Sequence, residues 1–130
     1  MRHLKTLTLS IIICITTTCR SNTISLDPEL FEQTLKQTAN PQLIDVRTFS
    51  EYAQGYLPGA LLMDIRKPAS FDSLISQLDK DRPVFVYCRI GRRSMDAAKI
   101  LEKKNHKVVY NLEGGILMWL EKGKEVAVIR

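Results

Sequence analysis

Cysteine is scarce in this chain of 130 residues, and its three copies are placed unevenly. Cys14 and Cys19 both lie near the start of the chain, so Cys88 is the only cysteine in the remainder. Small secreted domains usually carry cysteines in disulfide-forming pairs, and an isolated thiol forms no such bond within its domain. The lack of a second thiol also argues against a thioredoxin-like exchange cycle, which needs a resolving cysteine. A chemical role for Cys88 therefore has to be considered.

The sequence also lacks three other features: clustered histidines, basic runs with interleaved aromatics, and internal repeats. The two histidines, His3 and His106, are far apart, and neither belongs to a cluster with metal-ligand spacing. The net charge of +5 is mildly basic, but no basic run alternates with the scattered aromatic residues. The sequence therefore argues against nucleic-acid binding. There is no long linker or low-complexity tract, and the length predicts one domain.

The N-terminal segment has the features of an export signal. Arg2 and Lys5 give it a positive start, and residues 7–15 form a mostly apolar stretch. A membrane-spanning helix needs about 20 apolar residues, so a cleaved signal over residues 1–19 fits better than an uncleaved anchor helix. We therefore expect an exported protein.

Cys19 follows this segment in the manner of a bacterial lipoprotein cleavage site, at which the cysteine becomes the lipidated first residue. Thr16 and Thr18 stand where such sites usually have a leucine and a small residue, so lipidation and plain cleavage both stay open. The expected location is the bacterial periplasm, or a membrane surface to which a lipid on Cys19 tethers the domain.

Short apolar runs alternate with helical patterns along the rest of the chain. The predicted strands are residues 43–46, 60–65, 84–87 and 108–110, and residues 126–129 form either a last strand or a cover. The predicted helices are residues 25–37, 50–54, 71–78, 94–104 and 116–120. This alternation predicts an α/β domain with a mainly parallel sheet, whose strands are buried on both faces.

Cys88 stands at the end of a predicted strand, directly before a loop and a helix that begins near Ser94. In open α/β sheets the ligand crevice lies at the carboxyl ends of the strands, so Cys88 is expected in that crevice. The backbone N–H groups of a curved loop and of a helix start point toward an anion. Such groups stabilise a thiolate.

The loop itself is rich in positive charge. Arg89, Arg92 and Arg93 lie within five residues of Cys88, and charges of this sign lower a cysteine pKa from about 8.5 toward neutrality or below. Gly91 allows backbone angles that other residues avoid. The prediction is a nucleophilic thiolate in a loop that accepts anions; the alternative is a buried structural cysteine followed by solvated arginines.

Residues 88–94, Cys-Arg-Ile-Gly-Arg-Arg-Ser, resemble the active-site loop of the rhodanese (sulfurtransferase) family, whose pattern is Cys-x-x-Gly-x-Arg-Ser. Two further stretches are similar to the family's amino-terminal and carboxyl-terminal motifs: LIDVRTFSEYAQGYLPGALLMDI and NLEGGILMWLEKG. The resemblance predicts a rhodanese-like domain over residues 24–130. One departure is Tyr56, which stands where the family usually has histidine.

The resemblance implies a three-layer domain in which helices flank a mainly parallel, five-stranded sheet. It also implies an enzyme of the thiosulfate:cyanide sulfurtransferase class, with Cys88 as the catalytic residue that carries the sulfane sulfur as a persulfide. The donor is a small anion such as thiosulfate, a polysulfide or a persulfide, and the acceptor is a thiol or cyanide. No metal or organic cofactor is required, and we expect a monomer. The implied substrate-binding residues are those of the loop: Arg89, Ile90, Gly91, Arg92, Arg93 and Ser94.

Asp45 and Arg47 lie at the end of another predicted strand and are expected near the same crevice. Our main interpretation is that they support the base of the loop by pairing with Arg93 or Glu51. The alternative is a direct contact with the substrate.

Two other functions remain as alternatives. A Cys-dependent phosphatase or arsenate reductase uses a Cys-x5-Arg loop, but only four residues separate Cys88 from Arg93 here, and Ser94 occupies the position of that arginine. A non-catalytic rhodanese-like binding module is the second alternative. The retained cysteine and complete loop argue against it.

Overall fold

The computed structural model describes residues 11–15 and 20–130 and contains a parallel sheet of five strands. Most of the predicted export signal, including Cys19, lies outside the described residues. The strands are β1 (Thr23–Leu26), β2 (Gln42–Asp45), β3 (Leu61–Leu62), β4 (Val84–Tyr87) and β5 (Val109–Leu112). Their order in the sheet is β1-β5-β4-β2-β3. The predicted mainly parallel sheet is therefore confirmed.

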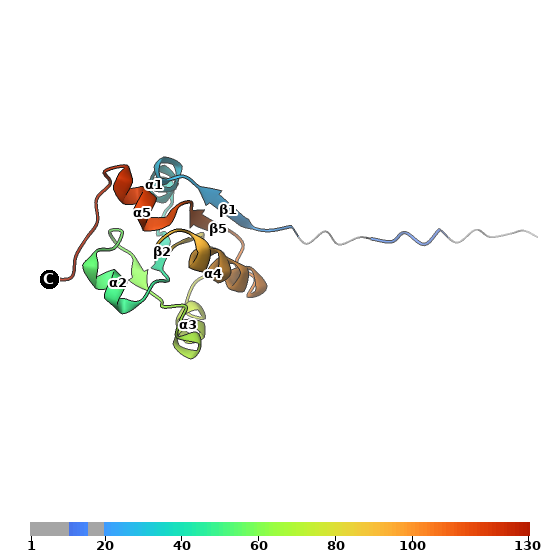
Figure 1. The fold of residues 1–130 in the computed structure, drawn as a ribbon. Coiled ribbons are helices and arrows are strands. Elements are labelled where there is room, and N and C mark those ends of the chain that lie inside the picture. The colour runs from blue at the N-terminus through green and yellow to red at the C-terminus, as the bar shows by residue number, and fades with distance from the viewer. Residues whose placement is uncertain (1–10, 16–19) are drawn as a thin grey trace, which may run out of the picture.

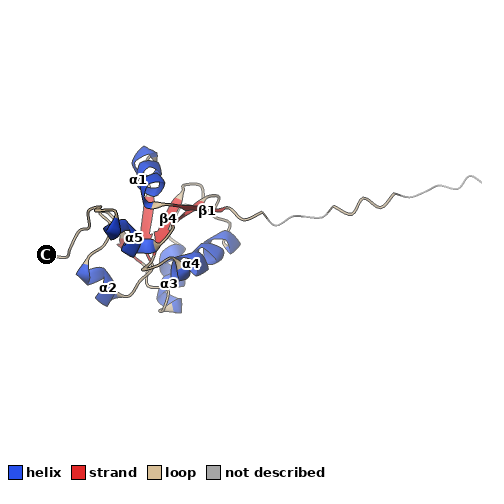
Figure 2. Cartoon of the chain, turned by 45° about the horizontal axis from the view of Figure 1, so that its top comes forward, coloured by secondary structure: helices blue, strands red, loops and turns tan. Residues whose placement is uncertain are grey.

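Helices cover both faces of this sheet (Figures 1 and 2). They are α1 (Pro28–Gln37), α2 (Phe49–Gln54), α3 (Pro68–Ile75), α4 (Arg92–Lys103) and α5 (Gly115–Glu121). Buried side chains of α3 and α4 pack on one face, and those of α1 and α5 pack on the other. The result is the three-layer α/β arrangement that the sequence predicts. None of these helices is long and apolar enough to cross a membrane.

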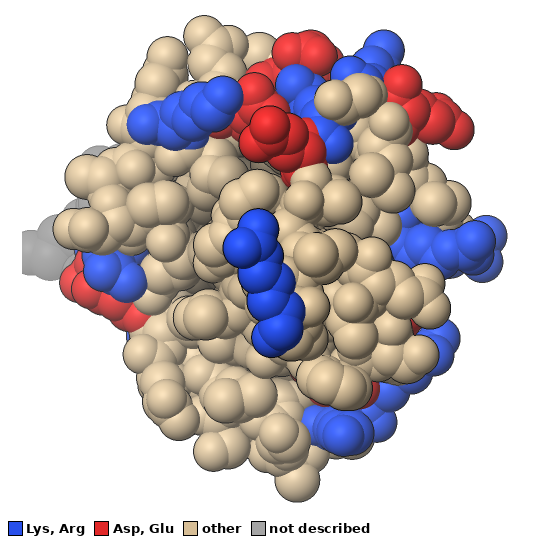
Figure 3. All heavy atoms as spheres, turned by 90° about the vertical axis from the view of Figure 1, so that its left-hand side faces the viewer, with Lys and Arg blue, Asp and Glu red and all other residues tan. Residues whose placement is uncertain are grey.

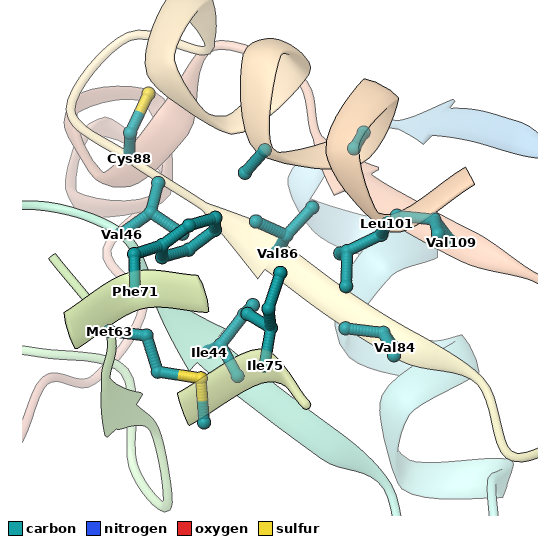
Figure 4. Close-up of a cluster of buried hydrophobic side chains, with 12 residues drawn as sticks. Ile44, Val46, Met63, Phe71, Ile75, Val84, Val86, Cys88, Leu101 and Val109 are labelled. Atoms are coloured by element: carbon teal, nitrogen blue, oxygen red, sulfur yellow. The ribbon is translucent and has the colours of Figure 1, made fainter. Parts of the chain in front are cut away.

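Strand β4 shows how the sequence builds the two cores. Val84 and Val86 face α3 and α4, whereas Phe85 and Tyr87 face α1 and α5. Successive side chains of a strand point to opposite faces, so four consecutive apolar residues supply both layers. Cys88 lies at the end of the cluster that Val84 and Val86 form with α3 and α4, and its sulfur is directed away from Val86 (Figure 4).

The two edges of the sheet differ from the sequence prediction. Strand β1 was not expected, because its residues overlap the start of the helix predicted at residues 25–37. The side chain of Asp27 accepts a hydrogen bond from the Leu30 amide, so α1 begins only at Pro28 and the preceding residues pair with β5. At the other edge, the strand predicted over residues 60–65 is reduced to β3, Leu61–Leu62. Of the two alternatives for residues 126–129, the structure shows the cover, which makes one antiparallel bridge from Ala127 to Tyr56.

The connections place one crevice at the centre of the sheet. The chain leaves β2 toward β3 on one side, and it leaves β4 toward β5 on the other. The carboxyl ends of β2 and β4 are neighbours, with Asp45 in register with Tyr87. Ligands of parallel α/β sheets bind at such a reversal of strand order.

Candidate active site

Cys88 is the first residue after β4, and it is only 1% exposed. The Gly91 amide donates a hydrogen bond to its sulfur over 3.1 Å, and the Ser94 Oγ lies 3.4 Å from the sulfur. The Ser94 hydroxyl also lies 3.1 Å from the Gly91 carbonyl oxygen, so its single proton can turn either to that oxygen or to the sulfur. The loop therefore folds around the sulfur, as the sequence predicts.

The loop lowers the pKa of the Cys88 thiol. Burial raises this pKa, but hydrogen bonds from the Ser94 hydroxyl and from the amides of Ser94, Gly91 and Ile90 outweigh it. Donors aimed at a sulfur favour the charged thiolate over the neutral thiol. The sequence predicts that the arginines lower this pKa together with the amides. The structure assigns the leading part to the amides and the serine hydroxyl.

The N-terminus of α5 holds the backbone of this loop. The Ile116 amide donates to the Cys88 carbonyl over 2.9 Å, and the Leu117 amide donates to the Arg89 carbonyl over 3.2 Å. Gly115 allows this approach, because a Cβ at its position would lie 2.3 Å from the Arg89 carbonyl oxygen. The sequence predicts no contact between Gly115 and the loop of Cys88. The two glycines directly before the helix predicted at residues 116–120 are the feature of the sequence that could have indicated this close approach.

The three loop arginines have different partners. The guanidinium of Arg93 donates to both carboxylate oxygens of Glu51, over 2.8 and 2.7 Å. This pairing lowers the pKa of Glu51 to about 2, and it links the loop to α2, where Glu51 also closes a capping box with Thr48. Arg93 is thus engaged within the protein. Arg89 and Arg92 are exposed, and neither has a carboxylate partner within residues 20–130.

Asp45 and Arg47 form a buried pair with each other, so the expected pairing with Arg93 or Glu51 is wrong. Arg47 Nη2 lies 2.6 Å from Asp45 Oδ2, and it also donates to the Gly55 carbonyl over 2.7 Å. The hydroxyl of Tyr87 donates to the same carboxylate over 2.6 Å and accepts from the Leu57 amide. The closeness in sequence explains the difference, because a side chain two residues away reaches the carboxylate without crossing the crevice.

This buried network supports the crevice, and its carboxylate, that of Asp45, cannot contact a ligand. Asp45 is fully buried, which removes the alternative of a direct substrate contact for this residue. Burial and the neighbouring Asp45 raise the pKa of Tyr87, so its phenol stays protonated and remains a donor. The network therefore joins β2, β4 and the segment at residues 55–57 beneath the loop.

A pocket of about 350 Å³ adjoins the loop, and its wall includes Arg89 and Arg47. A larger pocket of about 580 Å³ lies between α1 and the end of α5 and contains no loop residue. The smaller one is the candidate substrate site, because it borders the loop that holds Cys88. No group of three potential metal ligands occurs within residues 11–15 and 20–130.

Comparisons with known proteins give one consistent result. The family model "Rhodanese-like domain" matches residues 27–122. The chain is 38% identical over 98 residues to a sulfurtransferase of Allochromatium vinosum, which covers 75% of this chain and 89% of that protein. It is 32% identical over 87 residues to a thiosulfate sulfurtransferase of Shewanella oneidensis, which covers 67% of this chain and 83% of that protein.

A solved structure shows the same fold. The polysulfide-sulfur transferase of Wolinella succinogenes, described as a homodimer, superposes with a TM-score of 0.69 and is 29% identical. The match covers 83% of this chain and 80% of that one. Together with the two sequence relatives, this similarity supports sulfur transfer as the general activity.

Proposed function

Since the chain belongs to the rhodanese-like domain family, we propose that it is a sulfurtransferase that carries a sulfane sulfur on Cys88. The observation that supports this most directly is the set of donors around the sulfur: the Gly91 amide at 3.1 Å and the Ser94 hydroxyl at 3.4 Å. These donors lower the pKa of the thiol and supply the nucleophile that covalent catalysis requires.

In the first half-reaction, the Cys88 thiolate attacks the outer sulfur of an anionic donor such as thiosulfate. A sulfur–sulfur bond forms to Cys88, the sulfur–sulfur bond of thiosulfate breaks, and sulfite leaves with the electron pair. The charge of −3 is the same on both sides. The sulfane sulfur passes from sulfite to Cys88 without a change of its oxidation level, so no external oxidant or reductant is needed. The exposed Arg89 and Arg92 attract the dianion and stabilise the departing sulfite.

In the second half-reaction, a thiolate or cyanide attacks the outer sulfur of the persulfide. The bond between the two sulfurs breaks, and its electron pair returns to Cys88. Between the two steps the loop amides hold an anionic persulfide where they first held the thiolate. Arg93 has a positioning role, because its guanidinium is occupied by Glu51 and fixes the loop against α2.

The two alternatives fit the geometry less well. A phosphatase loop needs an arginine that closes on the bound oxyanion, whereas Arg93 turns to Glu51 and Ser94 occupies the next position. A non-catalytic binding module has no need of a cysteine with a lowered pKa. Each feature favours sulfur transfer.

Steady-state kinetics with thiosulfate and cyanide test the proposal. We expect thiocyanate formation with parallel double-reciprocal lines, the pattern of a ping-pong mechanism, and a loss of more than about 1,000-fold in Cys88→Ser. Cys14→Ser is the matched control and should keep full activity. Cys88-dependent hydrolysis of aryl phosphates without thiocyanate formation would contradict the proposal and establish the phosphatase alternative.

A further inference from the structure

The pocket beside the catalytic loop has a composition that inorganic thiosulfate does not require. This side pocket of about 350 Å³ is lined by Arg47, Arg89, Ile116, Leu117, Leu120 and Val126, among others. Its wall begins next to the nucleophile, because the amides of Ile116 and Leu117 bind the carbonyls of Cys88 and Arg89. Seen from the side of α2 and α5, the acidic side chains lie mostly toward the edge of the molecule (Figure 3).

The charged groups of the side pocket favour an anion. Arg89 is exposed and has no carboxylate partner within residues 20–130. Arg47 is only 5% exposed; Asp45 and the Gly55 carbonyl occupy its Nε and Nη2, so Nη1 is left for a ligand. Glu51 also lines the pocket, but Arg93 binds both of its oxygens and compensates its charge.

Part of the lining of the side pocket is apolar. Leu117 and Leu120 project from α5 and are partly exposed, and Val126 from the C-terminal segment completes the wall. Pockets of roughly 300–1,000 Å³ with an apolar wall and a few fixed polar groups bind small organic molecules. A small inorganic anion has no apolar part that would contact this wall.

We propose that the side pocket binds the sulfur acceptor, and that this acceptor is a small organic thiol that carries a carboxylate. The carboxylate pairs with Arg89 and Arg47 Nη1, and the carbon chain lies on Leu117 and Leu120. This inference rests on the proposed sulfurtransferase function and defines its second substrate. The acceptor thiolate attacks the outer sulfur of the Cys88 persulfide, the product is an organic persulfide, and Cys88 returns to the thiolate. One sulfur–sulfur bond forms and one breaks, and the charge of the reacting sulfurs stays at −2.

Three acceptors of similar size test the specificity. The pre-formed Cys88 persulfide is mixed with 3-mercaptopropionate, 2-mercaptoethanol or cysteamine, and rates are corrected for the thiolate fraction. We expect a second-order rate constant about tenfold higher for 3-mercaptopropionate than for 2-mercaptoethanol, and the lowest value for the cationic cysteamine. Equal corrected constants, with a persulfide that forms normally, would overturn the inference and leave the sulfurtransferase function intact.

A matched pair of variants locates the effect. Leu120→Glu puts a negative charge in the side pocket, and Leu30→Glu puts the same charge on α1; the two leucines are 47% and 49% exposed. We expect Leu120→Glu to raise KM for 3-mercaptopropionate about fivefold and to raise KM for 2-mercaptoethanol, which has no carboxylate, by a smaller factor. Leu30→Glu should change neither value. Equal effects of the two variants would contradict binding in the side pocket.

Binding without chemistry separates this inference from the proposed function. Pentanoate has the carboxylate and the chain but no thiol, and pentylamine is its cationic counterpart. We expect pentanoate, and not pentylamine, to shift the methyl NMR resonances of Leu117, Leu120 and Val126 in the full chain, with a weaker effect in Arg89→Gln. Absence of these shifts would refute the pocket even if Cys88 forms a persulfide. Their presence without any persulfide would refute only the sulfurtransferase chemistry.

Discussion

The segments that follow β2 and β4 meet at one crevice and both carry charged side chains, but they use them in opposite ways. At the end of β2, Asp45 and the following Arg47 bind each other and are almost completely buried. After β4, Arg89 and Arg92 stay exposed, while backbone amides turn inward to the Cys88 sulfur. A charge with an internal partner builds the crevice, although Nη1 of Arg47 is left over for a ligand, and a charge without such a partner is fully available to a ligand. The partner of an arginine, more than its distance from the cysteine, indicates its role.

The largest effect on stability is expected from the segment after β2. Asp45→Ala leaves the buried Arg47 without its carboxylate, and removal of one partner of such a pair costs about 3–5 kcal/mol. Urea unfolding measures this loss. Glu51→Ala is the control at a partly exposed pair and should cost only about 1 kcal/mol. A loss below about 1 kcal/mol for Asp45→Ala would mean that this segment is not the structural half of the crevice.

The next effect concerns the support of the loop after β4. Gly115→Ala places a methyl group 2.3 Å from the Arg89 carbonyl oxygen, so the loop must move. Displacement of a reacting group by about 1 Å can lower the rate about 100-fold, and we expect a loss of that order in kcat/KM for thiosulfate. Gly123→Ala has a similar positive φ of 70° and nothing within 4 Å, so it controls for backbone strain. Equal losses in the two variants would contradict a role of Gly115 in positioning the loop.

The two kinds of loop arginine should differ in their kinetic signature. Arg89→Gln removes an exposed charge, and we expect KM for thiosulfate to rise about tenfold with little change in kcat. The rise should shrink at high ionic strength, because exposed charges are screened. Arg93→Gln breaks the link to Glu51, and we expect a lower kcat with KM nearly unchanged. The comparison fails if both variants raise KM alone.

The smallest effect is a shift with pH. Ser94→Ala removes a hydroxyl that lowers the pKa of Cys88, so this pKa should rise. The thiolate is the reactive form, and it is populated above the pKa. The rate of Cys88 alkylation by iodoacetamide should therefore decrease most at low pH and match the wild type at high pH. A decrease of the same factor at every pH would indicate a steric effect instead.

Local patterns predicted much of this molecule, and contacts between distant residues account for what was missed. The apolar run at β4 and the loop that follows it are continuous in sequence, so the strand, Cys88 and its amide donors were predictable. Strand β1 pairs with β5, which lies far along the chain, and its own pattern is too short to separate it from α1. Glu51 on α2, the partner of Arg93, and the contact of Gly115 with Arg89 could not be predicted either, because these contacting residues are also far apart in sequence.

The measurement that tests the central claim most directly is the intact mass of the full chain after incubation with thiosulfate. The account predicts that the wild type gains the mass of one sulfur atom, that cyanide removes it, and that Cys88→Ser never acquires it. Arg93→Gln should gain the same mass more slowly, because its nucleophile is present but poorly positioned. A wild-type chain that gains no sulfur, with a Cys88 thiol that titrates at its ordinary pKa, would contradict the account.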